Sequence, residues 1–196
     1  MKKICVFCGS SRGIKGIYVR EAEKLAEALV EKNIELVYGG SNIGLMKSIA
    51  DRVLALDGKV TGVMPGNLAA REILHESITE AILVEDMQVR KKTMEELSDG
   101  FITMPGGIGT LDELFEMMSW NQLGIIHKPV GIYNVDHYYD PLIAWLDHAV
   151  EMKFVRPEHR ANTIVDDDPI ALIEKMENYR GLVAEKWVES LKKNGY

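Results

Sequence analysis

The sequence predicts an α/β protein: a single Rossmann-like three-layer domain with a mostly parallel sheet flanked by helices. Short apolar segments that favour strands alternate with amphipathic helical patterns along the whole chain. The 196 residues contain no linker-like stretch and suffice for one domain that buries roughly 70% of its unfolded surface. We therefore expect one domain over residues 1–180, followed by a C-terminal helical tail over residues 181–196.

The order of the expected elements places several turns at one edge of the sheet. Strands are expected at residues 4–8, 35–38, 59–64, 81–84, 100–104, 129–133 and 163–165, and helices at about 14–33, 44–56, 87–98, 110–122, 141–153 and from 169 onward. Asp168 and Pro169 are typical of an N-cap and a first helical residue. Ligands of such sheets bind at the carboxyl ends of the strands, where the following helices begin. The segment after residue 65 fits neither pattern.

Composition excludes several classes of partner. A net charge of −7 argues against nucleic acid, because binding to a phosphate backbone needs clustered Lys and Arg. No apolar run approaches the ~20 residues of a membrane span, so no membrane association is expected. The N-terminus runs straight into a strand pattern without a signal-peptide core, which favours a cytoplasmic location.

The cysteines and histidines do not indicate a metal site. Cys5 and Cys8 spell C-x-x-C, but residues three apart on a strand point to opposite faces, so we interpret both as buried apolar residues. The five histidines show no metal-ligand spacing and are expected to be structural or on the surface. We expect neither a metal nor a cofactor.

The most informative stretch is Pro105–Glu113, which reads P-G-G-I-G-T-L-D-E between an expected strand and an amphipathic helix. Glycines let a ligand approach the backbone, and the free N–H groups of a first helical turn suit a phosphate. The alternative is a capping box formed by Thr110 and Glu113. A capping box explains these two residues but not Gly106, Gly107 and Gly109.

A second glycine-rich turn, Gly39–Gly44, also joins a strand to a helix. It is not a P-loop, because Leu45 stands where the P-loop lysine would be. The Pro105–Glu113 turn lacks the third glycine of a dinucleotide fingerprint, since Asp112 occupies that position. Kinase-like and NAD-binding functions are therefore disfavoured.

Arg90, Lys91 and Lys92 stand in the opening turns of an expected helix. Cations there oppose the helix dipole by about 0.3–1 kcal/mol each, and a solvated basic face is the plain alternative. The anion-suited turn at the same sheet edge favours a function for Arg90, leaves Lys91 open, and leaves Lys92 in solvent. A site with fixed N–H donors, a cation and a carboxylate suits a phosphorylated sugar whose anomeric carbon faces the carboxylate.

In these residues the chain resembles the Lonely Guy family of cytokinin-activating phosphoribohydrolases, whose members are often mislabelled as lysine decarboxylases. The hallmark P-G-G-x-G-T-x-x-E is Pro105–Glu113, and the preceding Arg-Lys pair is Arg90-Lys91. The match covers about residues 4–178 and includes Cys8-Gly9-Ser10-Ser11, Tyr38-Gly39-Gly40 with Gly44-Leu45-Met46, Arg71-Glu72, and Ser119-Trp120 with Gln122-Leu123-Gly124.

The resemblance implies hydrolysis of an N6-modified adenosine 5′-monophosphate, or of AMP, to the free base and ribose 5-phosphate without a metal or cofactor. It implies that Arg90 and Glu113 are the catalytic pair. It also implies a homodimer or a larger assembly. The residues implied to bind substrate are Glu72, Lys91, Gly106, Gly107, Ile108, Gly109, Thr110 and Ser119.

Two departures from the family pattern lie near the expected site. Lys47 replaces a usual glycine, and Gln88-Val89 replace His-Glu before Arg90, so both changes could alter base preference. A nucleotide carrier or sensor without turnover is the alternative function, although the intact catalytic pair argues against it. A lysine decarboxylase would need a pyridoxal phosphate lysine in a much larger fold. The sequence does not decide which base is preferred or how large the assembly is. It also does not decide whether the physiological role is hormone production or nucleotide salvage.

Overall fold

The computed structural model describes residues 1–69 and 74–181. The candidate residue Glu72 lies outside this part of the chain, as does the expected helical tail apart from Gly181.

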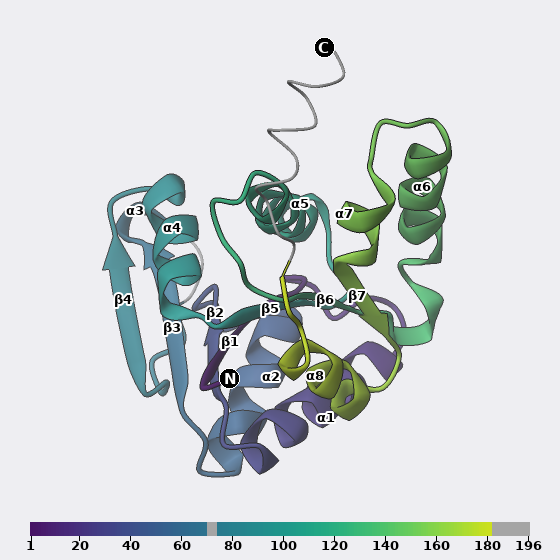
Figure 1. Ribbon diagram of the computed structural model, residues 1–196. Helices are drawn as coiled ribbons and strands as arrows, with labels where there is room; N and C mark the ends of the chain where they lie inside the picture. Colours follow the sequence, from purple (N-terminus) through teal and green to yellow (C-terminus); the bar gives the residue numbers. More distant parts are fainter. Residues whose placement is uncertain (70–73, 182–196) are drawn as a thin grey trace.

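Seven strands form one parallel sheet in the order β4-β3-β2-β1-β5-β6-β7 (Figure 1). This confirms the expected three-layer α/β domain, with a described sheet that is entirely rather than mostly parallel. Each strand is a short apolar run whose boundaries differ from the expected ones by at most a residue or two. The strands are β1 Lys3–Phe7, β2 Glu35–Tyr38, β3 Val60–Pro65, β4 Glu80–Val84, β5 Gly100–Thr103, β6 Val130–Tyr133 and β7 Thr163–Asp166.

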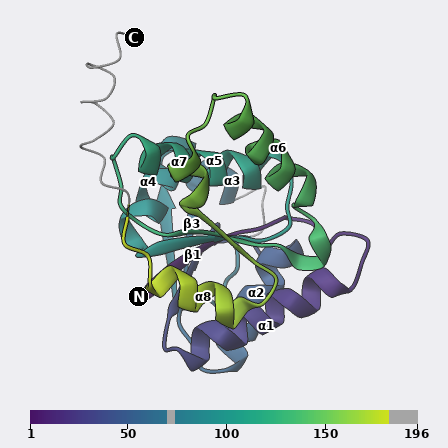
Figure 2. The ribbon, with the colours of Figure 1, turned by 45° about the vertical axis from the view of Figure 1, so that its right-hand side comes forward.

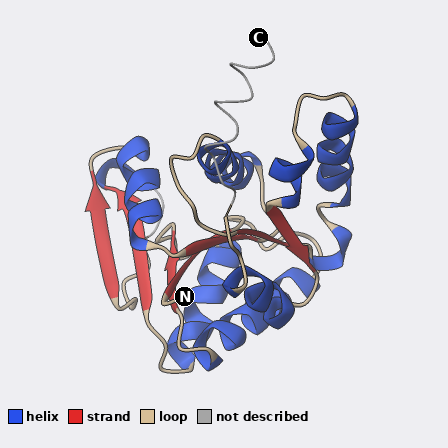
Figure 3. Cartoon of the chain, viewed as in Figure 1, coloured by secondary structure: helices blue, strands red, loops and turns tan. Residues whose placement is uncertain are grey.

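Helices cover both faces of the sheet (Figures 1 and 3). One face carries α1 Ile17–Glu31, α2 Gly44–Ala55 and α8 Pro169–Glu177, and a rotated view shows these helices on the same side (Figure 2). The other face carries α4 Met87–Leu97, α5 Ile108–Gln122 and α6 Asp140–Glu151. Three short elements were not expected: α3 Gly66–Ala69, η1 Val135–His137 and α7 Pro157–Ala161. No helix in residues 1–69 or 74–181 combines the length and apolarity needed to cross a membrane.

Strand β1 shows why each face needs its own helical layer. Ile4, Val6 and Cys8 pack in the core beneath α1 and α2, whereas Cys5 and Phe7 pack in the core beneath α5. Successive strand residues point to opposite faces, and both faces are covered, so every residue of this strand after Lys3 is apolar. The prediction that the two cysteines are buried on opposite faces is confirmed, and both are free thiols.

The strand order of the sheet reverses between the neighbouring strands β1 and β5. Strands β2, β3 and β4 extend the sheet on one side of β1, and β5, β6 and β7 extend it on the other. In open parallel sheets such a switch point leaves a crevice outside the carboxyl ends of the strands. Here the loops after β1 and β5 meet, since the Gly9 N–H donates to the Pro105 carbonyl at 3.0 Å. A Cβ on Gly9 would lie 3.3 Å from the Gly106 Cα.

Helix α4 follows the edge strand β4 but crosses back over the sheet. It packs on β3, β2 and β1 before the chain enters β5. The first turns of α4 and α5 therefore become neighbours although β4 and β5 are not.

Candidate active site

The glycine motif opens helix α5 two residues earlier than expected. The N-cap is Gly107, in an extended conformation (φ −100°, ψ −154°), and no side chain caps the helix. Thr110 is thus already inside the helix, and Glu113 lies in its second turn. The capping-box alternative is therefore wrong, and Glu113 is free for another role.

The glycines of this turn serve two different purposes. A Cβ on Gly106 would lie 2.1 Å from the Thr110 Oγ1, so this glycine is required by close packing against the buried threonine. A Cβ on Gly107 or Gly109 would meet no atom within 4 Å. The first turn of α5 is therefore open to a ligand, and its free N–H groups together with the helix dipole suit an anion.

A pocket of about 310 Å³ adjoins this turn at the switch point. The loop after β1 contributes Gly9, Ser10 and Ser11, and the loop after β5 contributes Pro105, Gly106 and Gly107. Two aromatic residues, Tyr18 and Tyr138, also line it. Neither tyrosine was predicted, although the position of Tyr138 directly after the sixth strand indicated the same sheet edge.

Arg90 and Glu113 meet across the gap between α4 and α5. The Arg90 Nη1 lies 3.2 Å from the Glu113 Oε1, and the two side chains are only 13% and 12% exposed. The Arg90 Nε donates to the Val63 carbonyl at 3.0 Å, which fixes the guanidinium against the end of β3. The structure therefore brings the two residues of the predicted catalytic pair together.

Gly39 makes room for this pair. A Cβ at Gly39 would lie 2.1 Å from the Arg90 Nη2. The second glycine-rich turn thus has a function that the sequence pattern did not reveal: its first residue leaves space for the guanidinium.

Burial controls the charge of Glu113. Desolvation raises the pKa of this carboxyl to about 7, and the nearby Arg90 guanidinium opposes the rise. A carboxyl that titrates near neutral pH in a buried site has the property expected of a general base.

Lys91 joins the two helices instead of pointing into the glycine turn. Its Nζ lies 3.2 Å from the Asp112 Oδ2 and 3.0 Å from the Glu116 Oε1, and its side chain is 11% exposed. Burial alone would lower the pKa of Lys91, but hydrogen bonds to Glu116 and Asp112 outweigh burial and raise it. Lys91 is therefore held as a cation between α4 and α5.

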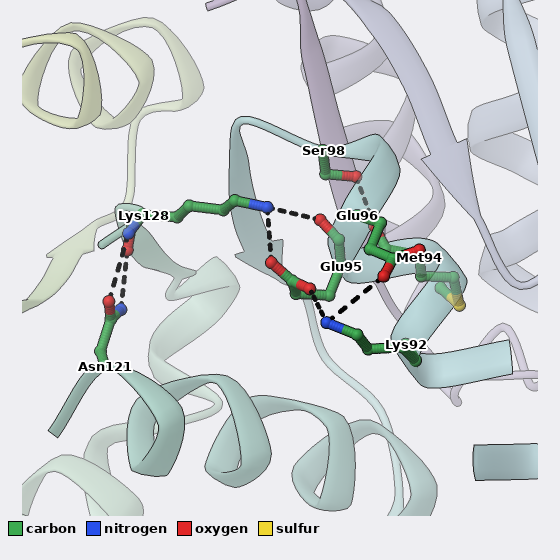
Figure 4. A network of polar contacts seen from close by, with 7 residues as sticks. All are labelled: Lys92, Met94, Glu95, Glu96, Ser98, Asn121 and Lys128. Atoms are coloured by element: carbon green, nitrogen blue, oxygen red, sulfur yellow. Dashed lines mark hydrogen bonds and ion pairs between the residues drawn. The ribbon is translucent and has the colours of Figure 1, made fainter. Parts of the chain in front are cut away.

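A second polar network fastens the far end of α4 (Figure 4). The buried Glu95 carboxylate accepts from the Lys128 Nζ at 2.6 Å and from the Lys92 Nζ at 3.1 Å, and Asn121 holds the Lys128 backbone. Burial would raise the pKa of Glu95, but the two lysines outweigh it and hold the pKa below its usual value.

Lys92 was expected in solvent, yet it is half-exposed and ion-paired, with its Nζ 5.8 Å from the centre of the Trp120 ring. The helices carrying Arg90 and Glu113 are thus joined at both ends.

Comparison with known proteins identifies the family. The family described as "Possible lysine decarboxylase" matches residues 46–176. A probable cytokinin riboside 5′-monophosphate phosphoribohydrolase of Oryza sativa subsp. japonica, LOGL2, is 48% identical over 178 residues, which cover 91% of this chain and 73% of the relative. The cytokinin riboside 5′-monophosphate phosphoribohydrolase LOG1 of Arabidopsis thaliana is 47% identical, with coverages of 91% and 84%. The chain belongs to this phosphoribohydrolase family.

Solved structures resemble the phosphoribohydrolase chain in fold alone. The molybdenum cofactor binding protein of Rippkaea orientalis superposes with a TM-score of 0.68 at 21% identity, over 91% of this chain and 97% of that one. The molybdenum cofactor carrier protein of Chlamydomonas reinhardtii also gives 0.68, at 17% identity, with coverages of 90% and 98%.

The remaining residues expected from the phosphoribohydrolase family do not gather at the glycine turn. Ser119 lines a separate pocket of about 300 Å³ with Phe115, Trp145 and His159, and this pocket shares no lining residue with the one beside the turn. Glu72 lies outside the described residues. In the part of the chain that the structure describes, no group of three His, Cys, Asp or Glu side chains is placed to hold a metal.

Of the departures from the phosphoribohydrolase pattern, Lys47 makes a local side-chain contact, whereas Gln88 and Val89 contribute backbone contacts that do not depend on residue type. The Lys47 Nζ pairs with the Asp51 Oδ2 at 2.9 Å along α2, and the same carboxylate contacts the His75 Nε2 at 2.9 Å. Gln88 and Val89 donate their backbone N–H groups to the N-cap Asp86 at 2.8 and 2.9 Å. These contacts involve neither Arg90 nor Glu113.

Proposed function

We propose that this member of the phosphoribohydrolase family hydrolyses the N-glycosidic bond of AMP or N6-modified AMP, releasing the free base and ribose 5-phosphate. The observation that carries the proposal is the buried Arg90–Glu113 pair beside the open first turn of α5. The names of its relatives, which designate cytokinin riboside 5′-monophosphate phosphoribohydrolases, support the substrate class.

Each part of the site has a role in this reaction. The N–H groups of Gly107, Ile108, Gly109 and Thr110 hold the 5′-phosphate at the start of α5. Glu113 faces the anomeric carbon, stabilises the oxocarbenium charge that develops as the bond to the base breaks, and takes a proton from the attacking water. The water oxygen bonds to the anomeric carbon, and the proton passes to the departing base. Arg90 fixes the carboxylate and limits the rise of its pKa.

Incubation of the purified protein with AMP and with an N6-alkylated AMP tests the function. We expect both the free base and ribose 5-phosphate to appear, and their relative rates to define the preferred base. Adenosine, which lacks the phosphate, is the matched control and should react far more slowly. If AMP binds but no adenine is released over hours, the hydrolase proposal fails and the protein is a nucleotide carrier.

A lysine decarboxylase activity receives no support from the lysine at the site. A Schiff-base lysine needs a depressed pKa so that its amine is neutral and nucleophilic. The pKa of Lys91 is instead raised by Glu116 and Asp112 despite burial. We propose no decarboxylase function for this chain.

We expect kcat/KM for AMP to fall about tenfold for each pH unit below 7 and to level off above it. The reason is that Glu113 acts as a carboxylate, and burial raises its pKa to about 7. The measurement is kcat/KM between pH 5 and 9. Binding of ribose 5-phosphate over the same range is the control, because it separates titration of the phosphate from titration of Glu113. A flat profile between pH 5 and 7 would exclude Glu113 as the base.

We expect Gly109→Ala to stabilise the protein yet weaken substrate binding. Alanine is favoured over glycine inside a helix by about 0.5–1 kcal/mol, and the new Cβ meets nothing within 4 Å. That open space is where the phosphate is proposed to approach, so KM should rise several-fold while the thermal midpoint increases. An unchanged KM would place the phosphate elsewhere.

We also propose that the protein is a cytoplasmic homodimer. Large apolar side chains are exposed near the end of α5 and along α6 and the following turn, including Leu123 (53%), Ile125 (59%), Trp145 (53%) and Phe154 (87%). We propose that these exposed apolar side chains belong to an interface with a second copy of the chain. Multi-angle light scattering should give twice the chain mass, and cell fractionation should place the protein in the cytoplasm.

A further inference from the structure

Tyr138 contacts the glycine turn from the opposite side of the pocket. It follows η1 after strand β6, and its side chain is 43% exposed and lines the pocket at the switch point. Its hydroxyl donates to the Gly106 carbonyl at 2.7 Å. Gly106 is thereby held between Tyr138 on its carbonyl and Thr110, which leaves no room for a Cβ.

A hydrogen bond to this carbonyl also sets the direction of the next N–H group. The peptide group joining Gly106 to Gly107 is planar and trans, so its C=O and its N–H point in opposite directions. The Gly107 N–H stands at the N-cap of α5, where no intrahelical acceptor exists for it. Since glycine flanks the peptide on both sides, side chains restrict its rotation little. A turned peptide would present its carbonyl oxygen, instead of its N–H, to an anion.

The loop that carries Tyr138 is held in an unfavourable backbone conformation by several contacts. Asp136 and His137 have φ values of 51° and 59°, which cost about 1 kcal/mol or more each for residues other than glycine. Lys15 of the β1–α1 loop pairs with Asp136, and the Tyr18 ring meets the Tyr138 ring edge to face at 5.9 Å. These contacts join the β6–α6 loop to the β1–α1 loop through Lys15 and to the first turn of α1 through Tyr18, and they hold Tyr138 beside Gly106.

We infer that Tyr138 is a positioning residue for phosphate binding: its hydroxyl holds the Gly106 carbonyl so that the Gly107 N–H faces the substrate phosphate. The inference rests on the proposed function in one respect, namely that the ligand at this turn is a sugar phosphate. Tyr138 acts through the peptide and takes no part in bond cleavage.

The test is Tyr138→Phe, which keeps the ring and removes only the hydroxyl. Titration calorimetry should show ribose 5-phosphate binding weakened about three- to tenfold, the size typical of one hydrogen bond. KM for AMP should rise by the same factor, while kcat and inhibition by free adenine stay within about twofold of wild type. This split between phosphate and base distinguishes positioning of the phosphate from general damage to the site.

Tyr133→Phe is the matched control. Tyr139, the next residue in the loop, cannot serve, because its hydroxyl contacts the Gly106 backbone as well as the Met104 carbonyl. Tyr133 ends β6 just before the loop, and its buried hydroxyl donates to the Glu21 carboxylate of α1. Removing the Tyr133 hydroxyl should lower the thermal midpoint without weakening the binding of ribose 5-phosphate. Equal weakening in both variants would mean that the hydroxyls only stabilise the fold, and it would overturn the inference.

The same titrations separate failure of the inference from failure of the proposed function. If the wild-type protein hydrolyses AMP and Tyr138→Phe binds ribose 5-phosphate normally, only the inference is overturned. If the wild-type protein binds no ribose 5-phosphate, the inference is overturned whether or not AMP is hydrolysed. If it binds ribose 5-phosphate but releases no adenine from AMP, only the proposed hydrolysis fails.

Discussion

Glu113→Gln is expected to lower the rate of AMP hydrolysis by about a hundredfold or more, a typical loss for a group that stabilises charge in the transition state. Glutamine has nearly the same shape as glutamate. Its amide oxygen can still accept from the Arg90 Nη1, which lies 3.2 Å from the Glu113 Oε1 in the wild-type protein. The thermal midpoint should therefore change little. Single-turnover assays with AMP and thermal unfolding measure the two effects.

Asp112→Asn is the matched control for this variant. Asp112 precedes Glu113 on the same helix, but its side chain is 59% exposed, and Lys91 retains its ion pair with Glu116 when Asp112 is neutralised. Its activity should remain within a few-fold of wild type. Full activity of Glu113→Gln would mean that the carboxylate is dispensable and that another group activates water.

Gly39→Ala is expected to lower kcat/KM about a hundredfold, although alanine is chemically inert. The added Cβ would lie 2.1 Å from the Arg90 Nη2, so the guanidinium must move away from Glu113. Displacement of a site group by about 1 Å can cost this much activity. Because Arg90 opposes the rise in the pKa of Glu113, the pH of half-maximal activity should also move upward. The kcat/KM profile of the variant between pH 5 and 9 gives both quantities.

Gly16→Ala serves as a control for the effect of a glycine replacement as such. A Cβ there would make only an ordinary contact, 3.4 Å from the Arg20 Nη1. This variant should keep wild-type activity and an unchanged pH profile. Wild-type activity in Gly39→Ala would show instead that hydrolysis does not depend on where Arg90 lies.

The strands could be predicted because each is a compact apolar run followed by glycine, proline or polar residues. The missed elements α3, η1 and α7 span only four, three and five residues, too few to show helical periodicity. The start of α5 was misplaced because Gly107 caps the helix through its backbone conformation, without the side-chain signal that Thr110 offered.

The meeting of Arg90 and Glu113 was predicted correctly, but the sheet order alone would not have produced it. Strands β4 and β5 are not adjacent, and the pair forms because α4 crosses back over β3 and β2. The roles of Gly39 and Tyr138 depend on contacts between segments 51 and 32 residues apart in sequence, namely with Arg90 and Gly106, for which a single sequence carries no local signal.

The lysine-bound Glu95 of Figure 4 has a consequence for how the protein tolerates acid. The pKa of Glu95 lies below 4.5, so the stability that its ion pairs contribute is lost only as the pH falls through that lower value. The pKa of Glu113 is about 7, so this residue takes up its proton much earlier on acidification. At pH values between the pKa of Glu95 and that of Glu113, the protein should remain folded but be catalytically inactive. Inactivation near pH 5 should therefore be reversible, and returning the sample to pH 8 should restore full turnover without a refolding delay.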